Sequence, residues 1–254
     1  GTDTITNTEN LTASMFDDIL TGNTGVNIIL GLDGNDLING STGNDTLDGG
    51  NGTDTLTYST IASAVTVNLS LTAAQNTGGG GTDTISNFEN LTGGTAADIL
   101  TGNAGNNVID GGGSNDTIEG GLGDDTLIGN AGTDTVTYVN ATTGVTVSLA
   151  LATAQDTIGA GIDTLSTFEN LTGSNLNDTL TGDSGNNTIL GNNGNDTIEG
   201  GDGNDILTGG GGTDTVTYAN ASSAVTVSLA LTTAQNTIGA GTDTITTFEN
   251  LTGS

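Results

Sequence analysis

Single aliphatic residues recur along the chain at a nine-residue interval, each two positions after an acidic or amide residue. Between them lie polar turns that are rich in glycine. A nine-residue step with one obligatory apolar position fits neither an α-helix nor a long amphipathic strand. It fits a turn of about six residues followed by a strand of about three, whose central side chain points inward while its neighbours point out. In residues 178–216 the aliphatic positions are Leu180, Ile189, Ile198, Leu207 and Val216.

This pattern predicts an all-β fold, a right-handed parallel β-roll or β-solenoid. Two nine-residue steps make one flattened coil, so residues 18 positions apart lie on the same edge of successive coils. The strands of stacked coils then pair in parallel, and their aliphatic side chains pile into a thin core.

A longer repeat of 80 residues contains the nine-residue steps and aligns without gaps. The motif ENLT recurs at 9, 89, 169 and 249, which defines repeat units 1–80, 81–160 and 161–240 of one continuous solenoid. Residues 241–254 begin a fourth unit. Because both ends fall inside the pattern without an atypical capping unit, we expect either a piece of a longer array or a protomer that stacks end to end.

Two wider connections interrupt the nine-residue steps of each unit, at 163–178 and 214–243 in the third unit. The second contains AVTVSLAL (224–231), where Val225, Val227 and Leu229 alternate with smaller or polar residues, which predicts a strand buried on one face. The recurring aromatic residues occur only in these connections, and we expect them to fill a locally broader core rather than to bind a ligand. They are Tyr58, Tyr138, Tyr218, Phe88, Phe168 and Phe248.

Charge excludes several classes of partner. The 254 residues include 30 acidic side chains and no Lys, Arg or His, for a formal net charge of -30. Every ion pair must therefore use a cation from solution, and such a chain repels nucleic acids and anionic membranes. The absence of cysteine excludes disulfides and is compatible with export. No apolar run approaches a membrane span and the first residues lack a signal-peptide pattern, so we expect no membrane insertion and any targeting signal outside this chain.

Several turns share one glycine spacing. GGDGND (200–205), GGGGTD (209–214), GGNGTD (49–54) and GGGGTD (78–83) resemble the G-G-x-G-x-D-x-U-x nonapeptide of the repeats-in-toxin (RTX) calcium-binding proteins. The resemblance implies a β-roll with several calcium ions per chain, each held between turns on the same edge of successive coils. Calcium takes about 6 to 8 oxygen ligands, and glycine lets a turn aim its carbonyl groups inward.

The aspartate that ends each turn is the candidate metal ligand. One edge of the third unit reads Asp178, Asp196 and Asp214, and the opposite edge pairs Asn187 with Asp205. Because Asn supplies an oxygen without charge, we expect the all-Asp edge to bind calcium more tightly. The same sets recur as Asp98, Asp116 and Asp134 with Asn107 and Asp125, and as Asp18, Asp36 and Asp54 with Asn27 and Asp45. The candidate ligands are Asp36, Asp45, Asp54, Asp83, Asp98, Asp116, Asp125, Asp134, Asp163, Asp178, Asp196, Asp205, Asp214 and Asp243.

Some turns depart from the motif. ASMFDD (13–18) has lost its glycines, which weakens the expectation of calcium at Asp18. GGGSND (111–116) has Ser114 in place of the fourth-position glycine, which weakens the expectation at Asp116. The turns that end in Asn, such as GDSGNN (182–187), match the family pattern least well.

The composition also predicts a fold that depends on calcium. Ordering a residue costs about 1.5 kcal/mol, each coil buries few aliphatic side chains, and stacked aspartates repel one another. We therefore expect calcium to be required for folding, and the calcium-free chain to be largely disordered.

Repetition favours a structural function. We expect a calcium-stabilised module of an extracellular protein at a bacterial cell surface, serving in a stalk, a surface layer or a matrix filament, with neighbouring copies or further repeats stacked end to end. Two alternatives stay open: a secretion-assisting repeat region of a larger toxin or enzyme, and an ice- or polymer-binding surface built on rows of threonine. The chain has no His, Cys or Lys for base or nucleophile chemistry, and its recurring Glu residues follow the repeat, so we expect no catalysis in it.

Overall fold

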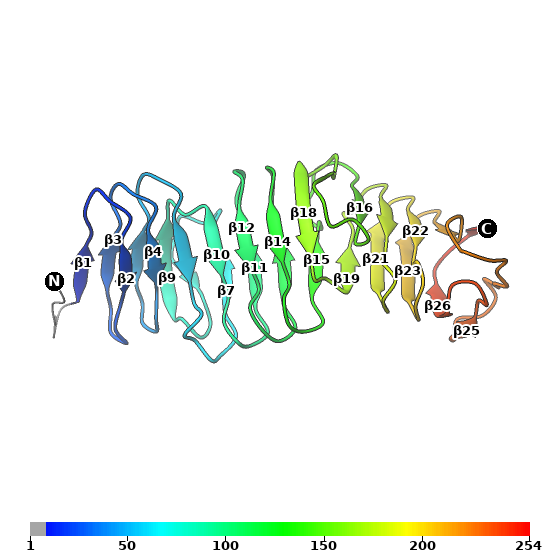
Figure 1. Cartoon of the computed structure of the whole chain (residues 1–254), viewed down its shortest axis with the longest axis horizontal. Coiled ribbons are helices and arrows are strands. Elements are labelled where there is room, and N and C mark those ends of the chain that lie inside the picture. Colours follow the sequence, from blue (N-terminus) through cyan, green and yellow to red (C-terminus); the bar gives the residue numbers. More distant parts are fainter. Residues whose placement is uncertain (1–8) are drawn as a thin grey trace.

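The strands of the chain wind into one elongated solenoid, whose coils follow one another along the long axis (Figure 1). The structure is a computed structural model, and it describes residues 9–254. All 27 regular elements in this range are β-strands, most of them three residues long. The predicted all-β parallel solenoid is confirmed.

The strands form four sheets, which we number in chain order. The first sheet, in spatial order, contains β1 (Asn10–Thr12), β3 (Ile28–Leu30), β5 (Thr46–Asp48), β9 (Thr82–Ser86) and β8 (Gln75–Asn76). The second contains β17 (Gln155–Asp156), β18 (Ile162–Ser166), β14 (Thr126–Ile128), β12 (Val108–Asp110), β10 (Asn90–Thr92), β6 (Thr55–Thr57), β4 (Leu37–Asn39) and β2 (Ile19–Thr21).

The third sheet contains β25 (Gln235–Asn236), β26 (Thr242–Thr246), β23 (Ile206–Gly211), β21 (Thr188–Asn193), β19 (Asn170–Thr172), β15 (Thr135–Thr137), β13 (Thr117–Glu119), β11 (Ile99–Thr101) and β7 (Thr66–Asn68). The fourth contains β16 (Thr146–Ser148), β20 (Thr179–Thr181), β22 (Thr197–Glu199), β24 (Thr215–Thr217) and β27 (Asn250–Thr252). Sheets do not follow the unit boundaries, because the second and the third sheet each join strands from all three 80-residue units.

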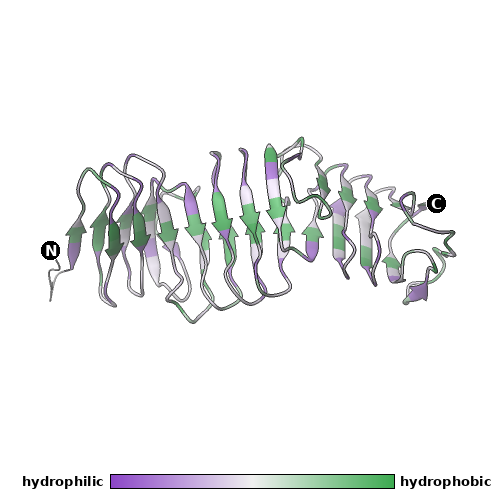
Figure 2. Ribbon diagram, in the orientation of Figure 1, coloured by the Kyte–Doolittle hydropathy of each residue, from purple (hydrophilic) through white to green (hydrophobic). Residues whose placement is uncertain are grey.

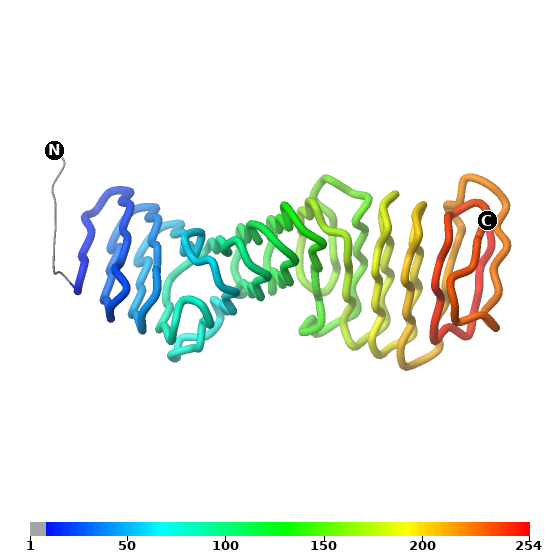
Figure 3. Tube along the Cα trace, turned by 90° about the horizontal axis from the view of Figure 1, so that it is seen from below, coloured from blue at the N-terminus to red at the C-terminus, as the bar shows by residue number. Residues whose placement is uncertain are grey.

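We call the coils built from two nine-residue steps the narrow coils. In them, residues that lie opposite each other on neighbouring strands are 18 positions apart in the sequence. Asn170 lies opposite Thr188 and Thr179 lies opposite Thr197, both in parallel pairs. This register confirms that two nine-residue steps make one coil. Figure 3 shows the narrow coils as regular steps, and the wide connection of the third unit as the broad orange loop near the C-terminus. Three antiparallel pairs, β8–β9, β17–β18 and β25–β26, occur where wide connections rejoin the coils.

The core is a single thin column of side chains from the strand centres. Ile189, Ile198 and Leu207 are fully buried, as are their counterparts in the other units. Figure 2 shows green, hydrophobic segments along many of the strands. The recurring aromatic residues are buried as well, which confirms that they fill the core: Tyr58, Tyr138, Tyr218, Phe88, Phe168 and Phe248.

One strand prediction is wrong. Residues 226–228, inside AVTVSLAL, are not a strand, although the equivalent residues of the first two units form β7 and β16. The reason is that β7 pairs with β11 and β16 pairs with β20, each in the following unit. The corresponding partner of residues 226–228 would lie beyond residue 254, so these residues pair with no strand in the part of the chain described.

Candidate metal sites

The aspartate or asparagine that ends each turn builds the sites. It lies where the turn passes into the next strand. The N–H of Asp178 donates to Oδ1 of Asp196, and the N–H of Asp196 donates to Oδ1 of Asp214, both at 2.9 Å. We call such a column of hydrogen-bonded carboxylates a ladder. The structure therefore brings together the aspartates that were predicted to be partners. Equivalent bonds of 2.7 or 2.8 Å join Asp36 to Asp54, Asp98 to Asp116, and Asp116 to Asp134.

The amide positions follow the same rule on the opposite edge. The N–H of Asn187 donates to Oδ1 of Asp205 at 2.9 Å, and its Nδ2 donates to the carbonyl oxygen of Glu169. Asn107 with Asp125, and Asn27 with Asp45, make the same contact at 2.8 Å. These are the pairs expected from the 18-residue spacing.

Nine aspartates keep a carboxylate oxygen that has no hydrogen-bond partner. In each, Oδ1 accepts the backbone N–H of the preceding rung, that is, of the Asp or Asn 18 residues earlier, while Oδ2 is buried without a donor. Their side chains are at most 2 % exposed. A buried anion without a partner is strongly destabilising, so each of these oxygens needs a proton or a cation. The nine are Asp36, Asp45, Asp54, Asp116, Asp125, Asp134, Asp196, Asp205 and Asp214.

The pKa values of these carboxyl groups reflect their environment. Burial raises the pKa of Asp116, Asp125 and Asp205 to about 7, and that of Asp196 to about 6. The charges of neighbouring carboxylates act in the same direction, and the backbone N–H donated to Oδ1 opposes them. These four carboxyl groups therefore hold their protons to higher pH than ordinary aspartates do, unless a cation replaces the proton.

A glycine at the start of most of these turns leaves space for the unpartnered oxygen. A Cβ on Gly191 would collide with Oδ2 of Asp196 and with the carbonyl oxygen of Gly209, which belongs to the next coil. A Cβ on Gly31 would collide in the same way with Oδ2 of Asp36 and the carbonyl oxygen of Gly49. A carboxylate oxygen and a backbone carbonyl oxygen thus converge on one point between coils. This mixed oxygen donor set is the type that calcium binds, so these turns fit the ion.

Three of the predicted ligands are already satisfied by hydroxyl groups. Oδ2 of Asp83 accepts hydrogen bonds from the Tyr58 hydroxyl at 2.8 Å and from Thr77 Oγ1 at 2.9 Å. Asp163 and Asp243 accept from Tyr138 and Tyr218, both at 3.0 Å. Each of these aspartates ends a ladder at a wide connection. Because their second oxygen already has a donor, they fit calcium less well than the nine above.

Two further predicted ligands are satisfied within their own turns. Oδ2 of Asp98 accepts the N–H of Gly94 at 2.5 Å, and Oδ2 of Asp178 accepts the N–H of Ser174 at 2.7 Å. The hydroxyl of Ser174 also donates to Asp178. These aspartates lie on the first rung of their ladders, after a turn that lacks the full glycine motif.

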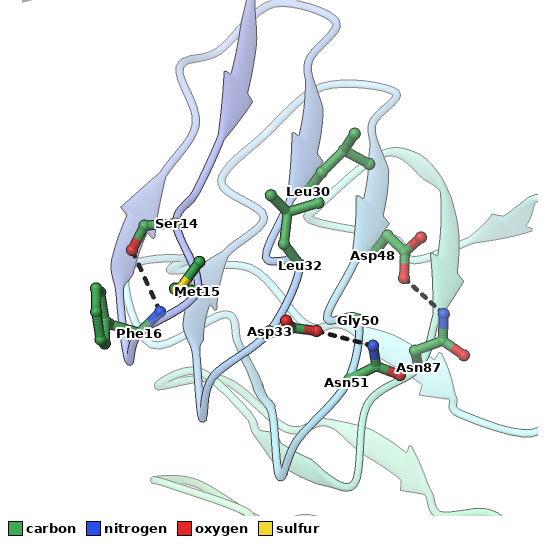
Figure 4. Close-up of a pocket in the computed structure, with 10 residues that line it drawn as sticks. All are labelled: Ser14, Met15, Phe16, Leu30, Leu32, Asp33, Asp48, Gly50, Asn51 and Asn87. Carbon is green, nitrogen blue, oxygen red and sulfur yellow. Dashed lines mark hydrogen bonds between the residues drawn. The ribbon is translucent and has the colours of Figure 1, made fainter.

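The two departures from the motif have different structural outcomes. Ser114 adopts a φ of 78°, so it occupies the left-handed region that the fourth-position glycine takes in several other turns, and Oδ2 of Asp116 stays unpartnered. Asp18 instead accepts two hydrogen bonds from Ser14, which lower its pKa. Next to it, the exposed side chains of Met15 and Phe16 line an open hollow over β3 and β5 (Figure 4).

The ladders continue across the unit boundaries through glutamates that sequence reasoning left without a role. The N–H of Asp54 donates to Oε2 of Glu89 at 2.8 Å, and Asn107 Nδ2 donates to the carbonyl oxygen of Glu89. The all-Asp series of one unit therefore runs into the Asn series of the next on one ladder, rather than along an edge of its own. The motif ENLT already indicated this role in the sequence, because its Glu lies two positions before a buried Leu, as the Asp does in the nonapeptides.

No group of three or more acidic side chains meets at one point in residues 9–254. Each coil contributes one carboxylate to an edge, so the remaining oxygens of a calcium site must be backbone carbonyls and water. This is consistent with the glycine-rich turns, whose backbone can approach an ion closely.

Comparison with known families supports the same chemistry. The family model described as "RTX calcium-binding nonapeptide repeat (4 copies)" matches residues 14–56, 92–127, 110–138, 172–207 and 190–219, more than half of the chain. Residues 57–91 and 139–171, which hold wide connections, are not matched. No curated protein matches the chain in sequence. Residues 9–254 contain no helix that could span a membrane.

Proposed function

The chain belongs to the RTX calcium-binding nonapeptide-repeat family, and from this premise we propose that it is a calcium-stabilised structural segment of a secreted protein. The observation that carries the proposal is the set of nine buried carboxylate oxygens without a hydrogen-bond partner. RTX nonapeptide repeats bind calcium, and the chain contains no Lys, Arg or His that could neutralise these carboxylates instead.

Calcium binding and folding are coupled in this proposal. The unpartnered oxygens come together only when successive coils stack, because each ladder contact joins residues at least 18 positions apart. An ion that binds only the folded chain stabilises it by about 2.7 kcal/mol when its concentration is 100 times the dissociation constant. Several such sites convert a repulsive acidic chain into a rigid solenoid, so the fold switches on where calcium is abundant.

Such a fold gives a rigid rod, which suits a structural role. The coils follow one another along the long axis in a continuous row (Figure 1), and calcium in the turns would resist bending between them. Outside the cell, calcium is plentiful enough to fill weak sites of extracellular modules. We place the segment at the bacterial cell surface, as part of a stalk, a surface layer or a matrix filament.

Further repeats or neighbouring copies stacked end to end belong to the proposal. Residues 241–254 closely repeat residues 1–14, which continues the array into a fourth unit. Residues 226–228 are the counterparts of β7 and β16, each of which pairs with a strand of the next unit. Another unit placed after residue 254 would find this segment and the outer side of β27 available for pairing.

Circular dichroism of calcium-depleted protein tests the coupling, with small-angle X-ray scattering on the same samples. We expect a disordered spectrum without calcium, and a β spectrum with the scattering profile of a rod after calcium is added. A full β spectrum in calcium-depleted buffer would contradict the proposal. Sedimentation across a concentration series in calcium tests stacking, which predicts assemblies that grow with concentration and dissolve in chelator.

One observation favours a second candidate function, binding to an ordered surface such as ice. On the fourth sheet, Thr146, Thr179, Thr197 and Thr215 lie in one row at strand spacing. Regular hydroxyl and methyl groups on a flat sheet can order water. Thermal hysteresis in calcium-loaded protein checks this: a value equal to that of a similarly charged control protein would exclude it.

A further inference from the structure

The junction between consecutive units has a turn of its own kind. In the narrow coils a six-residue turn, such as residues 49–54, leads from one strand to the next. Where the wide connection ends, only residues 87–89 lie between β9 and β10. The sequence of this short turn is NFE, and it is TFE at 167–169 and 247–249. These turns lie outside the residues matched by the RTX family.

The glutamate of this turn takes the place of an aspartate in the ladder. Oε2 of Glu89 accepts the N–H of Asp54 at 2.8 Å, just as Oδ1 of Asp54 accepts the N–H of Asp36. The N–H groups of Glu89 and Asn90 both donate to the carbonyl oxygen of Asp54, which holds the turn against the preceding coil. Glu169 with Asp134, and Glu249 with Asp214, repeat the 2.8 Å contact.

A second, independent observation at the junction points to a ligand. Oδ2 of Asp54 is buried without a partner, and the side chain is 0 % exposed. It lies 2.8 Å from the position of a Cβ on Gly49, and the carbonyl oxygen of Asn87 borders the same point. The equivalents are Oδ2 of Asp134 with the carbonyl of Thr167 at Gly129, and Oδ2 of Asp214 with the carbonyl of Thr247 at Gly209.

The backbone of the short turn is held in an unusual conformation that aims this carbonyl. Asn87, Thr167 and Thr247 have φ values of 56°, 57° and 58°. The left-handed region is unfavourable for a β-branched residue such as Thr, and strain of this kind clusters at binding sites. The same strained geometry appears at all three junctions, where it directs a carbonyl oxygen toward the unpartnered carboxylate.

We propose that Glu89, Glu169 and Glu249 are calcium ligands, each closing a site at a unit junction together with the carboxylate and carbonyl oxygens described above. The proposal rests on calcium binding by the chain. The three-residue turn brings no glycine motif, so the longer glutamate side chain extends from the strand end to a position that an aspartate reaches elsewhere. Such an ion ties the wide connection to the narrow coils and keeps consecutive units in register.

Isosteric substitution with a charge-matched control tests the proposal. The double variant E89Q/E169Q removes two junction carboxylates, and E119Q/E199Q removes two carboxylates that pair with Asn140 and Asn220 outside the ladders. Bound calcium is counted by equilibrium dialysis and mass spectrometry of the metal. We expect E89Q/E169Q to lose two ions per chain and E119Q/E199Q to lose none.

The outcomes separate the two proposals. Calcium binding by the wild type with the same count in E89Q/E169Q would overturn the junction sites alone. A wild type that binds no calcium would overturn both the junction sites and the proposed function. The single variant E89D keeps the charge but shortens the side chain, so we expect it to lose one ion.

Anomalous scattering from wild-type crystals grown in calcium gives a readout that does not depend on any variant folding. We expect a metal peak bounded by Asp54 Oδ2, the Asn87 carbonyl oxygen and the Glu89 carboxylate. Peaks in the nonapeptide turns without one at this junction would overturn the proposal.

Discussion

The backbone N–H of Asp196 donates to Oδ1 of Asp214 at 2.9 Å, across 18 residues of chain, while Oδ2 of both side chains stays buried without a partner. One oxygen of each carboxylate thus holds the coils together, and the other remains free for an ion. Because its two oxygens have different partners, one aspartate can both link two coils and bind a metal ion. Without calcium, the buried and unpartnered oxygens destabilise the folded chain.

The calcium-free fold should be more stable in mild acid than at neutral pH. Burial raises the pKa of Asp116, Asp125 and Asp205 to about 7 in the folded chain, above the value of about 3.9 for an unfolded aspartate. The folded chain therefore binds more protons between these values, and its stability falls as pH rises from about 4 to 7. Circular dichroism of calcium-depleted protein should show more β-structure at pH 5 than at pH 7.5. More β-structure at pH 7.5 than at pH 5 would contradict the inference that burial raises the pKa of these aspartates.

Two neighbouring rungs of one ladder should respond differently to the same substitution. D125N removes an unpartnered carboxylate oxygen, so we expect one calcium ion fewer and a less repulsive calcium-free chain. D163N weakens the buried contact with the Tyr138 hydroxyl, so we expect an unchanged ion count and a loss of about 1–3 kcal/mol in calcium. Metal analysis and thermal unfolding distinguish the two, and equal ion counts in both variants would contradict the assignment.

Filling the space beside a ladder oxygen should block calcium without changing charge. In G191A the new Cβ would collide with Oδ2 of Asp196 and the carbonyl oxygen of Gly209. We expect a higher calcium midpoint for folding and the loss of one ion. G113A is the matched control, since nothing lies within 4 Å of its Cβ. Similar calcium titrations for the two variants would show that the space beside Asp196 holds no ion.

Adding a charge at an amide rung should strengthen calcium binding there. N187D supplies a carboxylate beside Asp205, and it loses the Nδ2 hydrogen bond to the carbonyl of Glu169. We expect a lower calcium midpoint for that site and a less stable calcium-free chain. N193D adds the same charge at the exposed end of β21, where it loses only the exposed Nδ2 hydrogen bond to Asn175, and it should change neither quantity beyond about 0.5 kcal/mol. An unchanged midpoint in N187D would mean that charge does not limit affinity on this rung.

The nine-residue period was enough to predict most of the fold. A buried Leu or Ile two positions after each Asp or Asn predicts a strand and its inward side chain. Two such nine-residue steps give the 18-residue register of the paired strands. The partnership of Asp196 with Asp214 follows from that register alone. The glycine motif similarly indicated where oxygens would converge.

The sequence by itself determined the coil, its register and the identity of the aspartate rungs. Only the tertiary structure decided which carboxylates keep a free oxygen. Asp83 and Asp45 look alike as turn-ending aspartates, but the wide connection brings Tyr58 onto Asp83 across 25 residues and leaves Oδ2 of Asp45 unpartnered. Glu89 joins the ladder for the same reason, since the connection folds back across 35 residues to place it after Asp54. A strict period fixes neighbours at constant spacing, whereas the path of a long connection depends on how it packs.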